Sequence, residues 1–209
     1  MEIFDKLIKT FPALSVCLPD IQRAFETLRD TYTGGKRVYV CGNGGSAADS
    51  LHITGELMKG FLKKRPVTLS PEIALKLSPE TKARMESQLQ AALPCHSLMA
   101  ETALLTAISN DVSAEMVFAQ QVYGYGKPGD CLIAISTSGS AANVCLAAEL
   151  AGAMGLRTLG LTGRGGGKLA GLCGVSVRVP ADETPLIQEL HLPVYHALCA
   201  ALEEGFFVE

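Results

Sequence analysis

The sequence predicts an α/β fold in which a parallel sheet is covered by helices on both faces. Short apolar segments typical of buried strands alternate along the chain with longer segments of helical pattern. Two of the apolar segments run directly into loops of small polar residues. Alternation of this kind favours a parallel sheet, and ligands bind such sheets at the carboxyl ends of the strands. We therefore expect both loops to lie at one edge of the sheet.

The elements follow one another in order along the chain. Residues 1–33 have a helical pattern that Pro12 and Pro19 interrupt. Residues 67–92 look like an insertion, because a polar helix with Ser78 as its cap and Pro79 in its first turn breaks the alternation. The predicted strands cover residues 37–41, 130–135, 157–161 and 175–179, and the remaining predicted helices cover 46–63, 141–154 and 184–204.

Composition and charge narrow the class of protein. Lys and Arg number 18 and Asp and Glu number 21, so the formal net charge of −3 gives no general attraction to nucleic acid or anionic membranes. No apolar run approaches the ~18 residues of a membrane span, and no secretory signal is visible. The seven cysteines include no C-x-x-C pair, which is typical of reduced thiols in a core. We expect a cytoplasmic protein with no nucleic-acid or membrane partner.

The loop Gly42-Asn43-Gly44-Gly45-Ser46 has the composition of an anion-binding loop. Glycines let backbone N–H groups approach a phosphate, the Ser46 hydroxyl can donate, and the start of a helix adds partial positive charge. Gly42, Gly44 and Ala47 also match G-x-G-x-x-A, but a dinucleotide site needs an acidic residue about 20 positions later at the end of a strand. Here a helix continues instead. A tight turn without a ligand is the other alternative.

A second polar loop, Ser136-Thr137-Ser138-Gly139-Ser140, follows the strand predicted at 130–135. Hydroxyls and free helix N–H groups can hold three phosphate oxygens, whereas ordinary helix capping needs only one Ser or Thr. We therefore favour a phosphate site. A third glycine-rich stretch, from Thr162 to Leu169, lacks the first Gly and the final Ser or Thr of a Walker A loop, so we expect a turn there.

Four polar residues form a candidate metal or acid–base set. His52 and Glu56 lie four apart and share one helix face, which suits two ligands of one metal or an acid and a base. Gln188 and His196 are the other candidates, but eight helical residues rise about 12 Å. By spacing alone, His191 is the nearer partner for Gln188. The intervening proline could bend the helix, or the two residues could serve different copies of the site at a subunit interface.

Residues 40–49 (VCGNGGSAAD), followed by His52 and Glu56, resemble the sugar isomerase (SIS) domain family. Within it, the chain is similar to the sedoheptulose 7-phosphate isomerases, also called phosphoheptose isomerases. Further motifs of that family follow in order at residues 106–111 (TAISND), 135–139 (ISTSG), 159–163 (LGLTG), 167–171 (GKLAG) and 187–191 (IQELH). The resemblance covers nearly the whole chain outside 67–92.

The resemblance implies a single SIS domain over residues 1–209, with N-terminal helices at 1–33 and an inserted helical segment at about 67–92. The implied fold is a three-layer, flavodoxin-like sandwich around a five-stranded parallel sheet. The family assembles as a homotetramer with its sites at subunit interfaces. With 67–92 set aside, residues 93–98 fall on the family's second strand, so His96 is expected to be internal.

The resemblance also implies residue roles. His52, Glu56, Gln188 and His196 would ligate zinc, and here the family pattern selects His196 over His191. Glu56 and His196 would be the acid–base pair. Ser136, Thr137 and Ser138 would hold the phosphate, and Asn110 and Asp111 would contact substrate at an interface. The full predicted substrate-binding set is Asn43, Gly44, Gly45, Ser46, Glu56, Asn110, Asp111, Ser136, Thr137, Ser138 and Gln188.

The implied reaction interconverts sedoheptulose 7-phosphate and D-glycero-D-manno-heptose 7-phosphate, the first step of heptose precursor synthesis. Glu56 would move a carbon-bound proton to form an enediol, His196 would move a proton between oxygens, and zinc would polarise the carbonyl. Ala141 replaces a phosphate-binding serine of the family, for which the neighbouring Ser140 is the available substitute, and Pro185 replaces a frequent acidic residue. Two alternatives therefore stay open: an isomerase of another phosphosugar, or a non-catalytic SIS module that binds phosphosugars or a protein such as a replication initiator.

Overall fold

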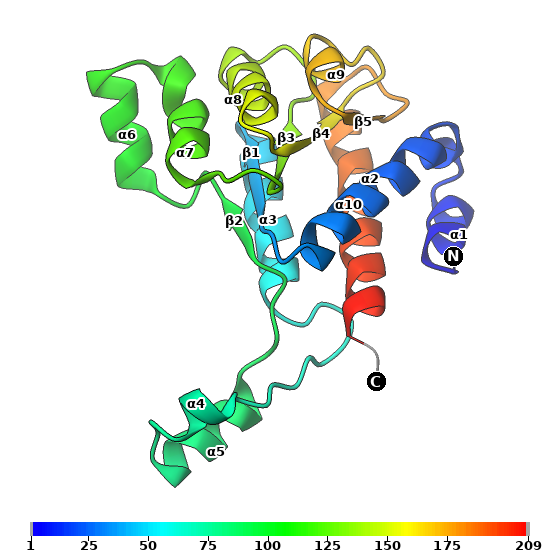
Figure 1. Ribbon diagram of the computed structural model, residues 1–209. Coiled ribbons are helices and arrows are strands. Elements are labelled where there is room, and N and C mark those ends of the chain that lie inside the picture. The colour runs from blue at the N-terminus through cyan, green and yellow to red at the C-terminus, as the bar shows by residue number, and fades with distance from the viewer. Residues whose placement is uncertain (1, 208–209) are drawn as a thin grey trace.

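The centre of the protein is a five-stranded, all-parallel sheet (Figure 1), seen in a computed structural model that describes residues 2–207. The strands lie in the order β2-β1-β3-β4-β5, which is the flavodoxin-like order. The predicted fold class is confirmed. The strands are β1 (Val38–Gly42), β2 (Cys95–Ser97), β3 (Cys131–Ile135), β4 (Arg157–Thr162) and β5 (Val175–Arg178).

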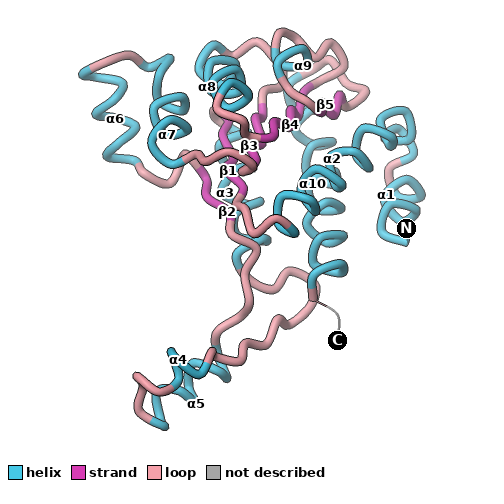
Figure 2. Tube along the Cα trace, in the orientation of Figure 1, coloured by secondary structure: helices cyan, strands magenta, loops and turns pink. Residues whose placement is uncertain are grey.

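Helices lie on both faces of the sheet (Figure 2). A hydrophobic core lies between the helices and each face, because alternate strand residues point to opposite sides. Val38 and Val40 of β1 face one core, and Tyr39 and Cys41 face the other. The first core is completed by α1 (Glu2–Thr10), α2 (Leu18–Thr33), α3 (Gly45–Met58) and α10 (Thr184–Phe206). The second is completed by α6 (Thr102–Asp111), α7 (Val117–Tyr125), α8 (Ala142–Ala153) and α9 (Leu169–Leu172).

Helix α3 ends at Met58, so the predicted helix over 46–63 is too long. Lys59 is extended, with φ −144° and ψ 174°. The carboxylate of Glu203 then accepts hydrogen bonds from the backbone N–H groups of the three following residues, 61 to 63. The side chain of Arg65 donates to the carbonyls of the last helical turn, so groups distant in sequence replace the helical hydrogen bonds.

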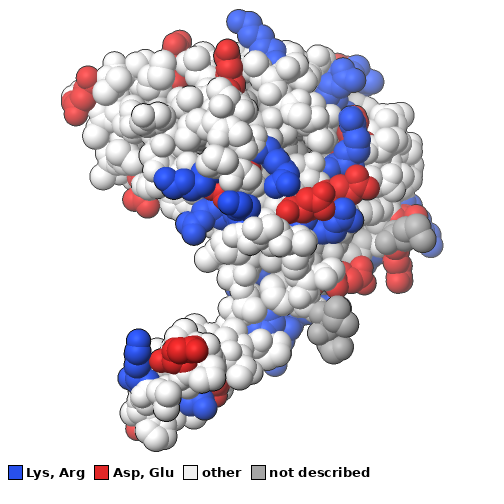
Figure 3. All heavy atoms as spheres, viewed as in Figure 1, with Lys and Arg blue, Asp and Glu red and all other residues white. Residues whose placement is uncertain are grey.

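Residues 67–92 form an arm that stands away from the body of the protein (Figure 1). It contains α4 (Pro71–Ala74) and α5 (Pro79–Gln88), and Ser78 caps α5 by accepting from the Thr81 N–H, as the sequence predicted. The base of the arm is closed by an antiparallel bridge between Pro66 and Gln90. No side chain from 67 to 92 is buried. Basic and acidic groups lie interspersed on the arm and the body in the view of Figure 3.

Three further elements lie between the arm and β3 and had no clear pattern in the sequence. They are α6, a 3₁₀ turn at Ala114–Met116, and α7. Only Ile108 of α6 is buried, whereas α7 buries much of one side against α8. Within residues 2–207 no helix is both long enough and apolar enough to cross a membrane.

Candidate active site

The two polar loops meet at the carboxyl edge of the sheet, where they surround a pocket of about 350 Å³. One loop follows β1 and the other follows β3, and these neighbouring strands mark the point where the strand order reverses. Ligands of such sheets bind at this switch point. The pocket is lined by Asn43, Gly44, Gly45, Ser46, Ile135, Ser136, Thr137, Ser138, Ala141, Thr184 and Gln188.

The first loop turns sharply into α3, and two of its glycines are required by the geometry. Gly44 has φ +56°, a conformation that other residues rarely adopt. A Cβ on Gly45 would lie 2.4 Å from Nε2 of Gln188, so the Gln188 amide rests directly on the start of α3. The side chain of Asn43 exchanges two hydrogen bonds, of 2.8 and 3.0 Å, with Asn143 of α8. This amide pair ties the first loop to the helix that follows the second.

The hydroxyl groups of the second loop do not cap the helix that follows it, which was the alternative to phosphate binding. Helix α8 has Ala141 as its N-cap residue and no side-chain cap. The glycine-rich stretch after β4 braces this loop through hydrogen bonds from Gly163 N to Thr137 O (2.9 Å) and from Leu169 N to Gly139 O (2.8 Å). The stretch is a turn, as predicted, and it fixes the neighbouring loop.

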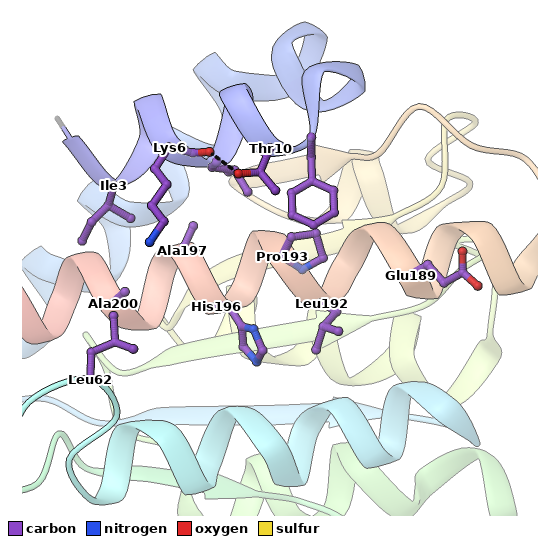
Figure 4. Close-up of a pocket in the computed structure, with 12 residues that line it drawn as sticks. Ile3, Lys6, Thr10, Leu62, Glu189, Leu192, Pro193, His196, Ala197 and Ala200 are labelled. Carbon is purple, nitrogen blue, oxygen red and sulfur yellow. Dashed lines mark hydrogen bonds between the residues drawn. The ribbon is translucent and has the colours of Figure 1, made fainter.

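Helices α3 and α10 run side by side from this pocket, and the candidate acid–base residues meet along their contact. His52 Nε2 lies 3.2 Å from Glu56 Oε1 and 3.4 Å from His196 Nε2. Figure 4 shows His196 projecting from α10 on the side of α3. Burial lowers the pKa of His196, and the neighbouring His52 lowers it further. These three side chains stay partly accessible, as a site open to a small ligand requires.

His191, which spacing alone favoured, does not belong to this cluster. Its side chain is 0% exposed, and neither ring nitrogen has a hydrogen-bond partner among residues 2–207. Burial lowers its pKa to about 4, so the ring is neutral at neutral pH. His96 lies half-buried on β2 with its ring edge-on to Tyr125, in agreement with an internal position.

Sequence reasoning missed two residues that contact the cluster. The hydroxyl of Tyr195 lies 3.0 Å from His52 Nδ1 and donates to Asp49 Oδ1 at 3.3 Å. Asp49 could have been noticed, because it lies one helical turn before His52. Tyr195 carried no signal, because a tyrosine in an apolar helix is typical of a core. Thr184, which lines the pocket, and Asn143, which pairs with Asn43, were also missed.

A family model described as the SIS domain matches residues 15–92 and 88–163. The phosphoheptose isomerase of Rhodospirillum rubrum is 39% identical over 195 residues, covering 93% of this chain and 90% of the relative. That of Akkermansia muciniphila is 38% identical over 197 residues, covering 94% and 91%. The chain belongs to the SIS-domain phosphoheptose isomerases.

Solved phosphoheptose isomerases share the whole fold. The structure of GmhA from Neisseria gonorrhoeae has a TM-score of 0.75 and 31% identity, covering 96% of this chain and 95% of that one. The structure from Francisella tularensis has a TM-score of 0.77 and 28% identity, covering 96% and 94%. The resemblance seen in the sequence motifs is therefore confirmed across nearly the full length of both chains.

The chemistry of the cluster in this phosphoheptose isomerase fits the zinc ion that the family implies. Imidazole nitrogens and a carboxylate oxygen are zinc donors, and two nitrogens on one tetrahedral zinc lie about 3.3 Å apart. The two histidine Nε2 atoms are 3.4 Å apart. No group of three or more His, Cys, Asp or Glu side chains within 2–207 is arranged to hold a metal without adjustment. Gln188 lines the adjoining phosphate pocket, so side chains would have to rotate to complete a shared site.

Asn110 and Asp111 are not brought to the phosphoheptose isomerase site within one chain. They end α6, are exposed, and are hydrogen-bonded to each other from Asn110 Nδ2 to Asp111 Oδ1 at 2.8 Å. Neither residue lines the phosphate pocket.

A larger groove of about 460 Å³ lies between α1 and α10, with His196 at its wall (Figure 4). Its lining is mainly apolar, from residues such as Leu7, Phe11 and Leu192, and contains neither polar loop. The smaller polar pocket is therefore the better candidate for a phosphosugar in this phosphoheptose isomerase.

Proposed function

We propose that the protein interconverts sedoheptulose 7-phosphate and D-glycero-D-manno-heptose 7-phosphate. As a phosphoheptose isomerase, it is an aldose–ketose isomerase. One observation carries the specific proposal: the phosphate pocket and the His52–Glu56–His196 cluster lie along the same contact between α3 and α10. Ser46 lines the pocket and His52 belongs to the cluster, and the six residues of α3 from one to the other rise about 9 Å. A sugar chain with phosphate at one end and carbonyl at the other suits this separation.

The two polar loops would bind the phosphate, and this remote contact would hold the reacting carbons beside the cluster. Glu56 would take the proton from the carbon next to the carbonyl, forming an enediol, and would return it to the neighbouring carbon. His196 would move the proton between the two oxygens. His52, which lies within 3.4 Å of both, would hold the pair in register.

We further propose zinc as the cofactor, held by His52, Glu56, Gln188 and His196. When bound, the ion would polarise the substrate carbonyl and stabilise negative charge on its oxygen. The support is the donor chemistry and the spacing of the two imidazoles, together with the position of Gln188 on the same helix as His196.

Assembly as a homotetramer is also proposed. Asn110 and Asp111 lie outside the pocket of their own chain, and α6 presents them to the exterior. A second copy could therefore supply these residues to the site. We propose a cytoplasmic location, because all seven cysteines are free, and six are buried.

The test is turnover of sedoheptulose 7-phosphate by metal-free protein, with and without added zinc. We expect zinc to restore conversion to a heptose 7-phosphate, with Ser136→Ala raising KM. Folded, zinc-loaded protein that converts no heptose phosphate would contradict the proposal and favour another phosphosugar or a binding module. Full turnover after zinc removal would contradict the cofactor alone.

A further inference from the structure

Tyr195 lies under the candidate metal cluster and contacts two of its polar neighbours at once. Its side chain is buried at 2% exposure, and its hydroxyl is 3.0 Å from His52 Nδ1 and 3.3 Å from Asp49 Oδ1. Its ring is also edge-on to both His52 and His196, with centroids 5.4 and 5.1 Å apart. The nitrogen that Tyr195 contacts is the one that faces away from Glu56 and His196.

The phenol has a single proton, so it can donate to only one of its two neighbours. Within residues 2–207, Oδ2 of Asp49 is shielded from solvent without a partner, and the Tyr195 hydroxyl is the only side-chain donor to Oδ1. A half-buried carboxylate that loses its one donor is left with a free-energy cost, so the phenol proton belongs on Asp49. The phenol oxygen is then an acceptor, and His52 must supply the proton from Nδ1. On the other side of the ring, His52 Nε2 lies 3.2 Å from Glu56 Oε1, and Lys59 Nζ lies 3.4 Å from the other Glu56 oxygen.

We propose that Tyr195 is a positioning residue, which receives the Nδ1 proton of His52 and so leaves the Nε2 lone pair facing Glu56 and His196. A histidine that binds metal through one nitrogen is ordinarily held by a hydrogen bond at the other. Here a tyrosine on α10, itself held by Asp49, does this for a histidine on α3. The role of this contact in metal binding rests on the proposed function. Which nitrogen of the His52 ring carries the proton is measurable without any turnover.

The first experiment is a long-range proton–nitrogen NMR spectrum of ¹⁵N-labelled, metal-free protein at a pH where the histidines are neutral. The chain has four histidines, so His→Gln variants assign the signals. We expect the proton of His52 on Nδ1 and an unprotonated Nε2. Asp49→Asn, whose amide can donate to the phenol oxygen, should release the phenol proton to His52 and shift it to the opposite tautomer. A wild-type ring protonated on Nε2 would overturn the inference.

The second experiment measures zinc affinity by competition with a chromophoric chelator. Tyr195→Phe keeps the ring and removes the hydroxyl, and we expect affinity to fall about 10- to 100-fold. Tyr32→Phe is the matched control, because the Tyr32 hydroxyl is also buried and has no hydrogen-bond partner in the described part of the chain, so zinc affinity should not change. Equal affinities of Tyr195→Phe and wild type would reject the inference. Absence of isomerase turnover would reject the proposed function and leave both readouts standing.

Discussion

Helix α10 forms one polar cluster with α3 and another with the segment that follows α3, and the two clusters are of opposite character. In the second, Arg65 and Glu203 are 0% and 1% exposed and form an ion pair of 2.8 Å. In the first, nearer the pocket, His52 lies 3.2 Å from Glu56 and 3.4 Å from His196, and all three stay open to solvent. The same helix therefore contributes to one closed cluster and one open cluster.

In the closed cluster, the hydrogen-bonding groups of Arg65 and Glu203 are paired within the protein. Glu203 accepts from Arg65 and from three successive backbone N–H groups, while Arg65 also donates to the carbonyls of Glu56 and Leu57 and stacks 4.6 Å from the Phe207 ring. Burial alone would raise the pKa of Glu203, but these hydrogen bonds outweigh it and hold the pKa below its ordinary value. No lone pair is left for a ligand, so this cluster supports structure.

The open cluster leaves its binding capacity unused. Its contacts are longer: Tyr195 holds the far nitrogen of His52 at 3.0 Å, and exposed Lys59 lies 3.4 Å from Glu56. Because the Glu56 carbonyl is held by Arg65, the closed cluster also steadies the helix that carries the open one. A structural polar cluster therefore differs from a reactive one less in its residue types than in how many of its hydrogen-bonding groups are already paired within the protein.

The largest expected effect is at the open cluster. Glu56→Gln keeps the shape of the side chain and removes the proposed base, so kcat should fall about 10²- to 10⁴-fold. The free energy of unfolding should change by less than about 1 kcal/mol, because Glu56 is partly exposed. Steady-state kinetics and urea unfolding check both, with Glu204→Gln as an exposed control on α10. Full turnover by Glu56→Gln would exclude the proposed base.

A substitution in the closed cluster should lower the stability of the protein strongly. Glu203→Ala leaves Arg65 and three N–H groups buried without their acceptor, so the protein should lose about 3–5 kcal/mol of stability. The adjacent Glu204→Ala removes an exposed carboxylate and should cost less than about 0.5 kcal/mol. Urea unfolding of both variants measures the contrast. Equal losses would mean that the buried pair contributes no more than a surface charge.

The buried His191 should make the free energy of unfolding depend on pH. Burial lowers the pKa of His191 to about 4, against about 6.5 in an unfolded chain. Between these values the unfolded state binds more protons, so stability falls as pH falls. From pH 7 to pH 5 this group should cost about 2 kcal/mol. Unfolding of His191→Leu at both pH values should show a smaller decrease than wild type by that amount. An unchanged pH dependence would contradict the prediction.

The smallest effect on stability is expected for the arm at residues 67–92. Unlike either cluster, it buries no side chain. Replacing residues 68–88 by two glycines should change the free energy of unfolding by less than about 1 kcal/mol, since only loop entropy and exposed groups are altered. Thermal and urea unfolding against the full chain measure this. A much larger loss would show that the arm packs on another chain.

Much of the fold could be predicted from local patterns. The strands β1 and β3 are buried along their whole length, and β4 is buried after Arg157, because both faces of a parallel sheet are covered; the edge strand β5 has a mixed pattern. The strand β2 emerged only from the family resemblance, since three residues make too short a pattern. The two polar loops were also predictable, because glycines and hydroxyls at strand ends carry their own chemistry.

The sequence by itself determined the sheet, the positions of the polar loops and the residue types available for chemistry, because these depend on neighbours along the chain. Spacing alone favoured His191 and the family resemblance favoured His196, and the tertiary structure shows the physical reason for the difference between them. Five residues place them about 140° apart around a helix of 3.6 residues per turn, so one faces the core and the other faces α3. The end of α3 at Met58 and the contact of Tyr195 with His52 were decided in the same way, by side chains about 140 residues distant in sequence. Such contacts have no local signature.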